Sequence, residues 1–271
     1  MDDIISVLKK IFTVQLDGNY EEGFKTLGFS HIVCLLIICV LVTAACAAFR
    51  RMGAHGKILL LRVISILLII TEIIQDLIFI FVAYTTILYN LPLHLCGLGL
   101  FVNLIIAFGI GRNGNGKIKA FILKVLEETD IVLILPGAVC ALITPDWTYL
   151  PIYNWQCIQG FFSHCLLVMF SSLLLFGGIY LPSFRHWYYP LVFLGSVSPL
   201  IYIFDKVFGC DYMFLLQPVY GTVLEYLEKV HGKDWYTFVF AVFVIIVILL
   251  IYLFLFLFHV IYGKIHKSKA E

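Results

Sequence analysis

The chain has 271 residues, of which 62% are hydrophobic and 13% are charged, and its mean hydropathy is +1.02. A water-soluble domain of this size needs a charged shell that this composition cannot supply, so a soluble globular protein is excluded. The net charge of +1 gives no basic surface for nucleic acid. Continuously apolar stretches such as 32–48 and 238–258 exclude the alternating pattern of a membrane β-barrel. We therefore expect an all-α, polytopic helical membrane protein.

Residues 1–28 precede the first long apolar segment. They begin with Asp2 and Asp3, where a cleaved signal peptide would be basic. Apolar residues then recur at helical spacing beside Lys9 and Lys10. This pattern predicts a short amphipathic helix that lies on the membrane surface.

The rest of the chain divides into apolar segments of about 20 residues, the length that crosses a bilayer as a helix. The fourth segment is short and contains Pro136, so seven spans become six if that segment does not cross. No soluble domain is left over, and residues 1–271 are predicted to form a single transmembrane domain. The predicted spans are 29–49, 60–84, 90–111, 129–145, 156–178, 186–204 and 235–262.

Basic residues are distributed unevenly over the connections between these spans. Twelve of the 18 Lys and Arg residues fall on one side of the membrane and six on the other. Because cytoplasmic connections carry the excess of basic residues, the side with twelve is predicted to be cytoplasmic. With seven spans, the N-terminus is then outside and the C-terminus is in the cytoplasm.

The longest external connection is predicted at 205–234. Within it, Thr222 and Glu225 have the spacing of a capping box, and Gly232 follows the last periodic residue. These signals predict a short helix at about 223–231.

Ionisable side chains cost at least a few kcal/mol to place in lipid, so their positions point to function. Glu72, Gln75 and Asp76 lie at i, i+3 and i+4, and therefore share one face of the second span. Other polar residues fall near the same predicted outer boundary: His31, His94, Cys96, Asp146, Gln159 and His164. Together they predict a polar site in the outer half of the membrane. The alternative is a structural hydrogen-bond cluster that ties the helices together.

His94 and Cys96 are two residues apart, so on a helix they would point about 200° away from each other. A dyad of these two is not predicted, and either could meet His164 from another span. A reactive Cys96 would need a base or a positive charge beside it. The other cysteines lie in apolar segments and are typical packing residues. No metal-ligand or nucleotide motif is visible, so no cofactor is predicted.

Several strings resemble the YwaF family of bacterial integral membrane proteins: Leu91-Pro92-Leu93-His94-Leu95-Cys96, Leu142-Ile143-Thr144-Pro145-Asp146, Phe161-Phe162-Ser163-His164, Asp211-Tyr212-Met213-Phe214-Leu215 and Trp235-Tyr236. This resemblance covers about residues 25–260 and implies a helical fold in a bacterial plasma membrane. The chain is also distantly similar to the animal transmembrane protein 164 family, acyltransferases that move fatty acyl chains between phospholipids using a Cys and a His. That similarity implies a catalytic role for His164. Where the animal family has Pro-Cys-His, this chain has Leu93 in the place of the Cys, and Cys96 follows one turn later.

The leading hypothesis is a lipid-modifying acyltransferase or acyl hydrolase that takes membrane phospholipid. The expected catalytic residues are His164 as general base, His94, Cys96 as candidate nucleophile, Glu72 and Asp76. The expected substrate-binding residues are His31, Asp146, Gln159 and Asp211. The alternatives are a proton-coupled transporter or small-solute-binding protein, and a non-catalytic accessory protein. The sequence predicts no oligomeric state.

Overall fold

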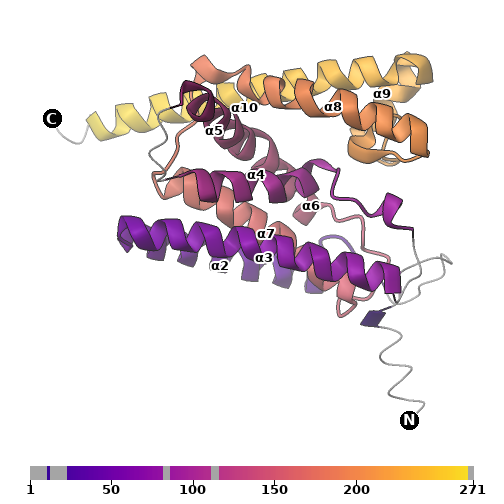
Figure 1. Cartoon of the computed structure of the whole chain (residues 1–271), viewed down its shortest axis with the longest axis horizontal. Coiled ribbons are helices and arrows are strands. Elements are labelled where there is room, and N and C mark those ends of the chain that lie inside the picture. Colours follow the sequence, from indigo (N-terminus) through magenta and orange to yellow (C-terminus); the bar gives the residue numbers. More distant parts are fainter. Residues whose placement is uncertain (1–10, 13–22, 82–85, 111–115, 268–271) are drawn as a thin grey trace, which may run out of the picture. The chain divides into compact units, whose positions relative to one another are not determined.

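The computed structural model describes residues 11–12, 23–81, 86–110 and 116–267, and its regular secondary structure within those ranges is all helical (Figure 1). The predicted all-α class is therefore confirmed. Contacts divide the chain into two compact units, the first formed by residues 1–114 and 134–179 and the second by residues 115–133 and 180–271. The surface helix expected within 1–28 falls mostly outside the described residues and stays a prediction.

Five of the described helical segments are long and apolar enough to cross a membrane. They overlap the first, second, fifth, sixth and seventh predicted spans, so a multi-pass membrane protein is confirmed. The count of seven and the orientation stay predictions. The five segments are Phe29–Arg51, Ala54–Phe81, Trp155–Phe176, Phe184–Phe208 and Lys233–Leu257.

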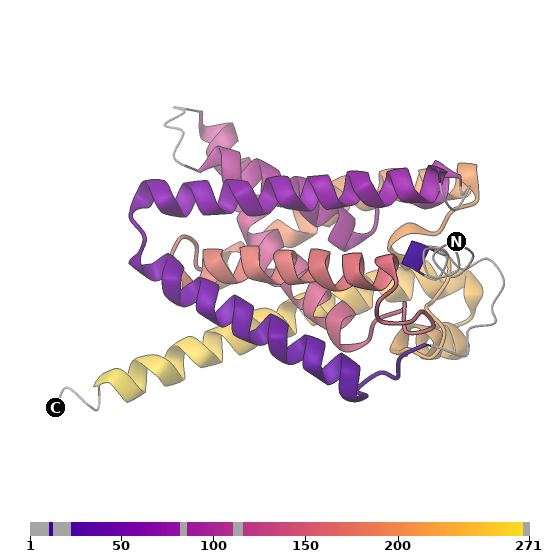
Figure 2. The same cartoon turned by 90° about the horizontal axis from the view of Figure 1, so that it is seen from below.

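The first unit is built around α7 (Trp155–Phe176), which contacts each of the unit's other helices. Figure 2 shows α7 running between α2 and α3. In the most apolar part of α7, 61% of residues are buried, against 6% in α2, so α7 forms the core and α2 presents its side chains outward. The other helices are α2 (Phe29–Arg51), α3 (Ala54–Phe81), α4 (Leu95–Gly109) and α6 (Leu135–Ile143), with a 3-10 turn, η1 (Ile87–Tyr89).

Basic side chains in the first unit bond the C-terminal end of α7. Arg50 Nε donates to the Phe176 carbonyl at 2.8 Å, and Lys57 Nζ donates to the Gly177 carbonyl at 3.4 Å. Carbonyls at a helix C-terminus lack partners within the helix and attract positive charge. Helix α3 includes Lys57 and begins six residues before the predicted span of 60–84.

The third and fourth predicted spans differ from what the structure contains. Helix α4 has only 15 residues. A continuous helical run passes through α5 (Lys117–Thr129), the π-helical turn η2 (Asp130–Ile134) and α6 (Leu135–Ile143), and so begins well before the predicted 129. The wide turn precedes Pro136, whose missing N–H and bulky ring disrupt the regular hydrogen-bond pattern of a helix.

The second unit pairs α5 with α8 (Tyr189–Phe208) and α9 (Val223–His231) with α10 (Tyr236–Lys267). Three 3-10 turns join them: η3 (Phe184–His186), η4 (Tyr212–Phe214) and η5 (Lys233–Trp235). Buried Asp205, in the last turn of α8, accepts a hydrogen bond from Tyr212 N at 3.0 Å. Tyr236 Oη donates to the Phe214 carbonyl at 2.9 Å. Helices α8 and α10 therefore each form a hydrogen bond with the η4 segment.

Helix α9 matches the short helix predicted at about 223–231. Thr222 Oγ1 accepts from Leu224 N at 3.2 Å, while the Glu225 carboxylate accepts from Gly221 N at 2.7 Å. A regular capping box would pair Glu225 with the N–H of Thr222, so the bond is shifted by one residue. Gly232 has a φ of +86°, as expected for the glycine that ends a helix.

Candidate functional site

His164 lies on α7, the buried helix of the first unit. Its Nδ1 is 2.7 Å from the Gly160 carbonyl oxygen, and because a carbonyl can only accept, Nδ1 carries the proton. In the neutral ring, Nε2 then has a free lone pair. The ring packs on Trp147 with the ring centres 5.4 Å apart. A Cβ at position 160 would lie 3.0 Å from the Trp147 ring, so glycine allows this packing.

Asp146 links three of the residues that were predicted from separate segments. Its carboxylate lies within electrostatic range of His94, Cys96 and His164. Asp146 follows α6, His94 precedes α4 and His164 belongs to α7, so three helices of the first unit supply the group. Three of the predicted site residues thus share a fourth, Asp146, as an electrostatic neighbour.

The prediction that His94 and Cys96 face opposite ways assumed that both are helical. His94 is instead the N-cap of α4, with extended dihedral angles of φ −67° and ψ 159°. The helical spacing rule does not apply to such a residue, and both side chains lie within range of Asp146. The electrostatic neighbours of Cys96 are Asp146 and Cys140, and neither supplies the positive charge that favours a thiolate.

His31 is fully buried, and both of its ring nitrogens are bonded to main-chain atoms. Leu27 N donates to Nδ1 at 2.9 Å, and Nε2 donates to the Leu142 carbonyl at 2.7 Å. Leu27 adopts a φ of +57°, a conformation rare for a side-chain-bearing residue. With no ring nitrogen left for a ligand, this geometry favours a packing histidine that ties α2 to α6 over the expected substrate-binding role.

The remaining predicted substrate residues have local partners. Gln159 donates its side-chain amide to Ser163 Oγ at 3.0 Å, one turn further along α7. Asp211 lies in the second unit, where its Oδ1 accepts from Leu216 N at 2.9 Å. Burial raises the pKa of Asp211, and hydrogen bonds from the backbone of Leu216 and Gln217 oppose that shift.

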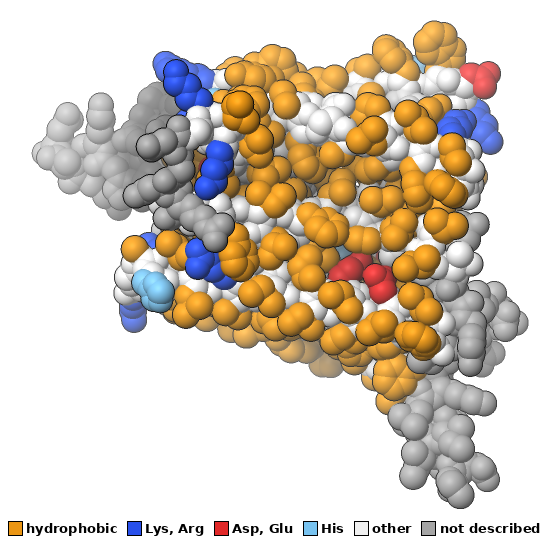
Figure 3. All heavy atoms as spheres, viewed as in Figure 1, with side chains coloured by type: hydrophobic (Ala, Val, Ile, Leu, Met, Phe, Trp, Pro, Cys, Tyr) orange, Lys and Arg blue, Asp and Glu red, His pale blue; other side chains and the backbone are white. Residues whose placement is uncertain are grey.

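Glu72, Gln75 and Asp76 form a separate acidic group on α3, as their spacing predicted. The charge that acts on Glu72 is that of Asp76, whereas the charge that acts on His94 and His164 is that of Asp146. Gln75 Oε1 and Asp76 Oδ1 are buried without a hydrogen-bond partner among the described residues. Figure 3 shows acidic atoms amid the hydrophobic side chains over α3. The predicted site is thus represented by two groups, one around Asp146 and one around Glu72.

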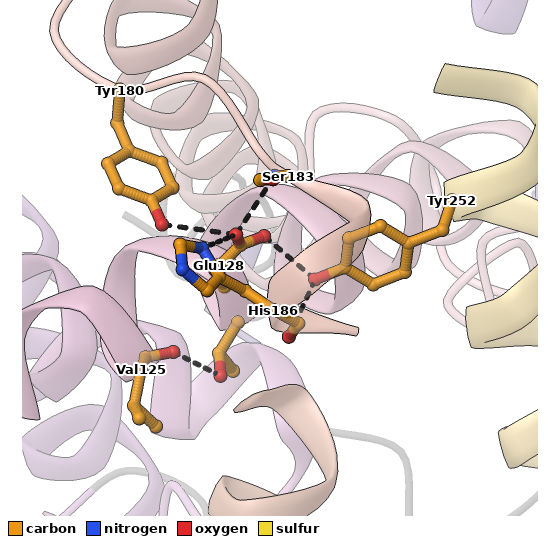
Figure 4. Close-up of polar contacts among 7 residues, drawn as sticks. Val125, Glu128, Tyr180, Ser183, His186 and Tyr252 are labelled. Atoms are coloured by element: carbon orange, nitrogen blue, oxygen red, sulfur yellow. Dashed lines mark hydrogen bonds and ion pairs between the residues drawn. The ribbon is translucent and has the colours of Figure 1, made fainter. Parts of the chain in front are cut away.

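Sequence reasoning missed a polar centre in the second unit, which we call the Glu128 network. Glu128 is fully buried at the end of α5. Its Oε1 accepts hydrogen bonds from Tyr180 Oη at 3.1 Å, Ser183 N at 3.0 Å and His186 Nδ1 at 3.0 Å, and its Oε2 accepts from Tyr252 Oη at 2.7 Å (Figure 4). The sequence feature that could have indicated this network is the acidic pair Glu127 and Glu128, which lies directly before the predicted span 129–145.

Within the described residues, no group of three His, Cys, Asp or Glu side chains is arranged to hold a metal ion.

The apolar helices and their buried polar groups define a multi-pass helical membrane protein. The chain belongs to the TMEM164 family, whose family model matches residues 26–252 and so spans both units. Searches of curated proteins and of solved structures found no match. The likeness to the transmembrane protein 164 family is supported, while the likeness to the YwaF family stays a prediction.

Proposed function

We propose that the protein is a lipid-modifying enzyme of the membrane, an acyltransferase or acyl hydrolase, with His164 as its general base. The observation that carries this proposal is the hydrogen bond between His164 Nδ1 and the Gly160 carbonyl. It fixes the ring and leaves Nε2 able to take a proton. A general base needs this combination of orientation and a free lone pair.

The proposed reaction uses an oxygen nucleophile, the hydroxyl of a lysolipid or of water. Nε2 of His164 takes the hydroxyl proton while the oxygen attacks the carbonyl carbon of a phospholipid ester. When the tetrahedral intermediate collapses, the C–O bond to the leaving lipid breaks and the imidazolium returns the proton to that oxygen. Asp146 stabilises the transient positive charge on the ring, and His94 is the candidate donor to the oxyanion.

We favour an oxygen nucleophile over Cys96 because of the surroundings of the thiol. Asp146 and Cys140 are its electrostatic neighbours, and a thiolate needs a cation or a base beside it. Leu93 stands where the similar animal family has its cysteine. The membrane helices supply the setting for lipid chemistry. A bacterial plasma membrane, with the site in the outer half, is part of the proposal.

The test is turnover of acyl-labelled phospholipid with a lysolipid acceptor by the purified protein in detergent. We expect His164→Gln to lower the rate by about 10²- to 10⁴-fold, the usual contribution of a general base. The exposed His55, at the start of α3, provides the matched control His55→Gln, which should retain the wild-type rate. Equal rates in the two variants would remove His164 from the mechanism.

A second pair of variants tests the nucleophile. Cys96→Ser should stay within a few-fold of wild type, as should the control Cys39→Ser on the outward-facing side of α2. Loss of turnover in Cys96→Ser alone would make the thiol the nucleophile. No turnover by the wild-type protein with any phospholipid would contradict the enzyme proposal itself.

The acidic group on α3 favours a second candidate function, binding or proton-coupled transport of a small solute. Buried Gln75 and Asp76 atoms without partners are acceptors that a cationic or hydrogen-bonding solute would satisfy. Solute flux in proteoliposomes that is abolished by Glu72→Gln, and unaffected by His164→Gln, would support transport over catalysis.

A further inference from the structure

The Glu128 network includes a histidine, His186, that reaches the surface of the second unit. The carboxylate accepts from two tyrosine hydroxyls, one backbone N–H and one imidazole N–H, so its oxygens are fully occupied as acceptors. An anion best satisfies four donors. The His186 side chain beside it is 28% exposed, whereas that of Glu128 is 0% exposed. The His186 ring therefore extends from the buried carboxylate to the surface.

The ring of His186 is held in place on several sides. Its Nδ1 is bonded to Glu128, and its face stacks on Tyr189 with ring centres 4.5 Å apart and planes within 13°. Tyr252 Oη also lies 3.3 Å from the His186 carbonyl oxygen. These contacts order the turn η3 before any ligand arrives, which reduces the entropy lost on binding. The opposite ring nitrogen, Nε2, has no bond to another described residue and can donate to an anion.

Two further exposed basic side chains lie on the elements that form the network. Arg185 precedes His186, is exposed, and makes no bond with another described residue. Lys124, one turn before Glu128 on α5, is also exposed. Phe121 and Tyr189 pack with ring centres 5.4 Å apart, which brings that part of α5 against the start of α8. The acidic side chains nearby, Glu127 and Glu128, are 7% and 0% exposed, so neither carboxyl group is at the surface beside these basic side chains.

Exposed aromatic side chains flank the basic group on the same turn. Phe184 is 54% exposed, Trp187 38% and Tyr188 42%. Aromatic rings of this kind gather at the level of lipid headgroups, where one end of the side chain is apolar and the other is wet. Basic residues beside such a belt bind the phosphates of anionic lipids.

We propose that Arg185, His186 and Lys124 form a binding site for the phosphate of an anionic membrane lipid, with Glu128 holding the His186 ring in place through Nδ1. The lipid's acyl chains would lie along the exposed aromatic residues of the turn. This site uses residues of the second unit alone and does not depend on the chemistry proposed for His164. Glu128 acts here as a positioning residue.

The test measures lipid retention by the full chain, purified in mild detergent, by native mass spectrometry. Equal amounts of phosphatidylglycerol and phosphatidylcholine with identical acyl chains are offered. We expect a preference for phosphatidylglycerol that falls about fivefold in Arg185→Gln and in His186→Gln. The control Arg51→Gln removes an exposed basic residue from the end of α2 in the first unit and should leave the preference unchanged.

The outcomes distinguish a lipid site from nonspecific charge attraction and from a site for a soluble anion. Unchanged preference in Arg185→Gln would overturn the proposal, and this exposed variant remains decisive if His186→Gln fails to fold. An equal fall in Arg51→Gln would show attraction to charge anywhere on the protein, and would also overturn it. Displacement of the lipid by millimolar inorganic phosphate would assign the site to a soluble anion and overturn the lipid assignment. Preserved preference in wild type with phosphate present, lost in Arg185→Gln, supports the lipid.

Discussion

In the first unit the His164 ring is bonded at one nitrogen, whereas in the second unit the Glu128 carboxylate accepts four hydrogen bonds. A buried group whose bonding capacity is filled stabilises the fold, because any change leaves its partners unsatisfied. A histidine such as His164, with one ring nitrogen that makes no hydrogen bond to another described residue, can still exchange a proton at that nitrogen. We therefore propose a chemical role for His164 and a structural role for Glu128, and mutation can test each proposal separately.

The largest expected effect comes from removing the Glu128 carboxylate. Glu128→Ala leaves four donors without an acceptor and should lower the free energy of unfolding by about 3–5 kcal/mol. Denaturant or thermal unfolding in detergent measures this loss. Asp234→Ala, at an exposed acid in the same unit, should change stability by less than about 0.5 kcal/mol. A Glu128→Ala variant as stable as wild type would break the assignment.

The neighbouring acid, Glu127, differs from Glu128 because it has no hydrogen bond to another described residue. Burial raises the pKa of Glu127 to about 7; Lys124 opposes that shift and Glu128 adds to it. The folded state thus holds the proton more tightly than the unfolded state, so stability should fall as pH rises from about 4.5 to about 7.

Glu127→Gln should remove this part of the pH dependence and stabilise the protein at pH 8 by on the order of 1–3 kcal/mol. Unfolding curves of wild type and variant at several pH values measure the difference in their free energies of unfolding. The contributions of the other titrating groups are the same in both proteins and cancel in this difference. Parallel pH profiles for the two proteins would mean that Glu127 is ionised in the fold at no cost.

His31 lies in the same unit as His164, but both of its ring nitrogens are hydrogen-bonded. His31→Ala leaves Leu27 N and the Leu142 carbonyl unpaired, so we expect a loss of about 1–3 kcal/mol in stability. Turnover per folded molecule should remain near the wild-type value. A loss of turnover without a loss of stability would instead return His31 to the substrate site. His55→Ala serves as the control for removal of an exposed histidine.

The smallest effect is expected at the exposed start of α9, outside both polar centres. Thr222→Ala removes the side-chain cap of Leu224 N and should cost about 1 kcal/mol. Because this hydrogen bond is exposed to solvent, the stability lost with it is a reference value for the losses expected at the buried hydrogen bonds. A cost as large as that of Glu128→Ala would show that burial is not what distinguishes the network.

Local patterns in the sequence predicted those parts of the structure that depend on local chemistry. The continuous apolar length of α2 and α10 and the cap residues Thr222 and Gly232 each act within a few turns. The shared face of Glu72, Gln75 and Asp76 follows from helix geometry in the same way. The common depth of His94, Cys96 and His164 predicted a shared site, although not that Asp146 would be the acidic neighbour of all three.

Features that depend on long-range packing were not visible in the sequence. Lys57 lies outside the predicted span of 60–84, yet it belongs to α3 and bonds the carbonyl of Gly177, which is distant in the sequence. The donors of Glu128 come from positions 52 to 124 residues away, and no spacing rule connects them. The prediction that His94 points away from Cys96 assumed that both residues are helical. His94 instead caps α4, and the direction of a cap residue's side chain does not follow the rotation of about 100° per residue of the helix.

Helix α10 has 32 residues, which at 1.5 Å per residue gives a length of about 48 Å. The acyl region of a bilayer is only about 30 Å thick, so roughly three turns of this rod must stand clear of the lipid tails or be taken up by tilt. A short epitope inserted after Lys267, the last residue of α10, would be held away from the headgroups by the helix. Antibody access to this epitope in intact cells and in inverted vesicles would then show which compartment the C-terminal end of α10 enters.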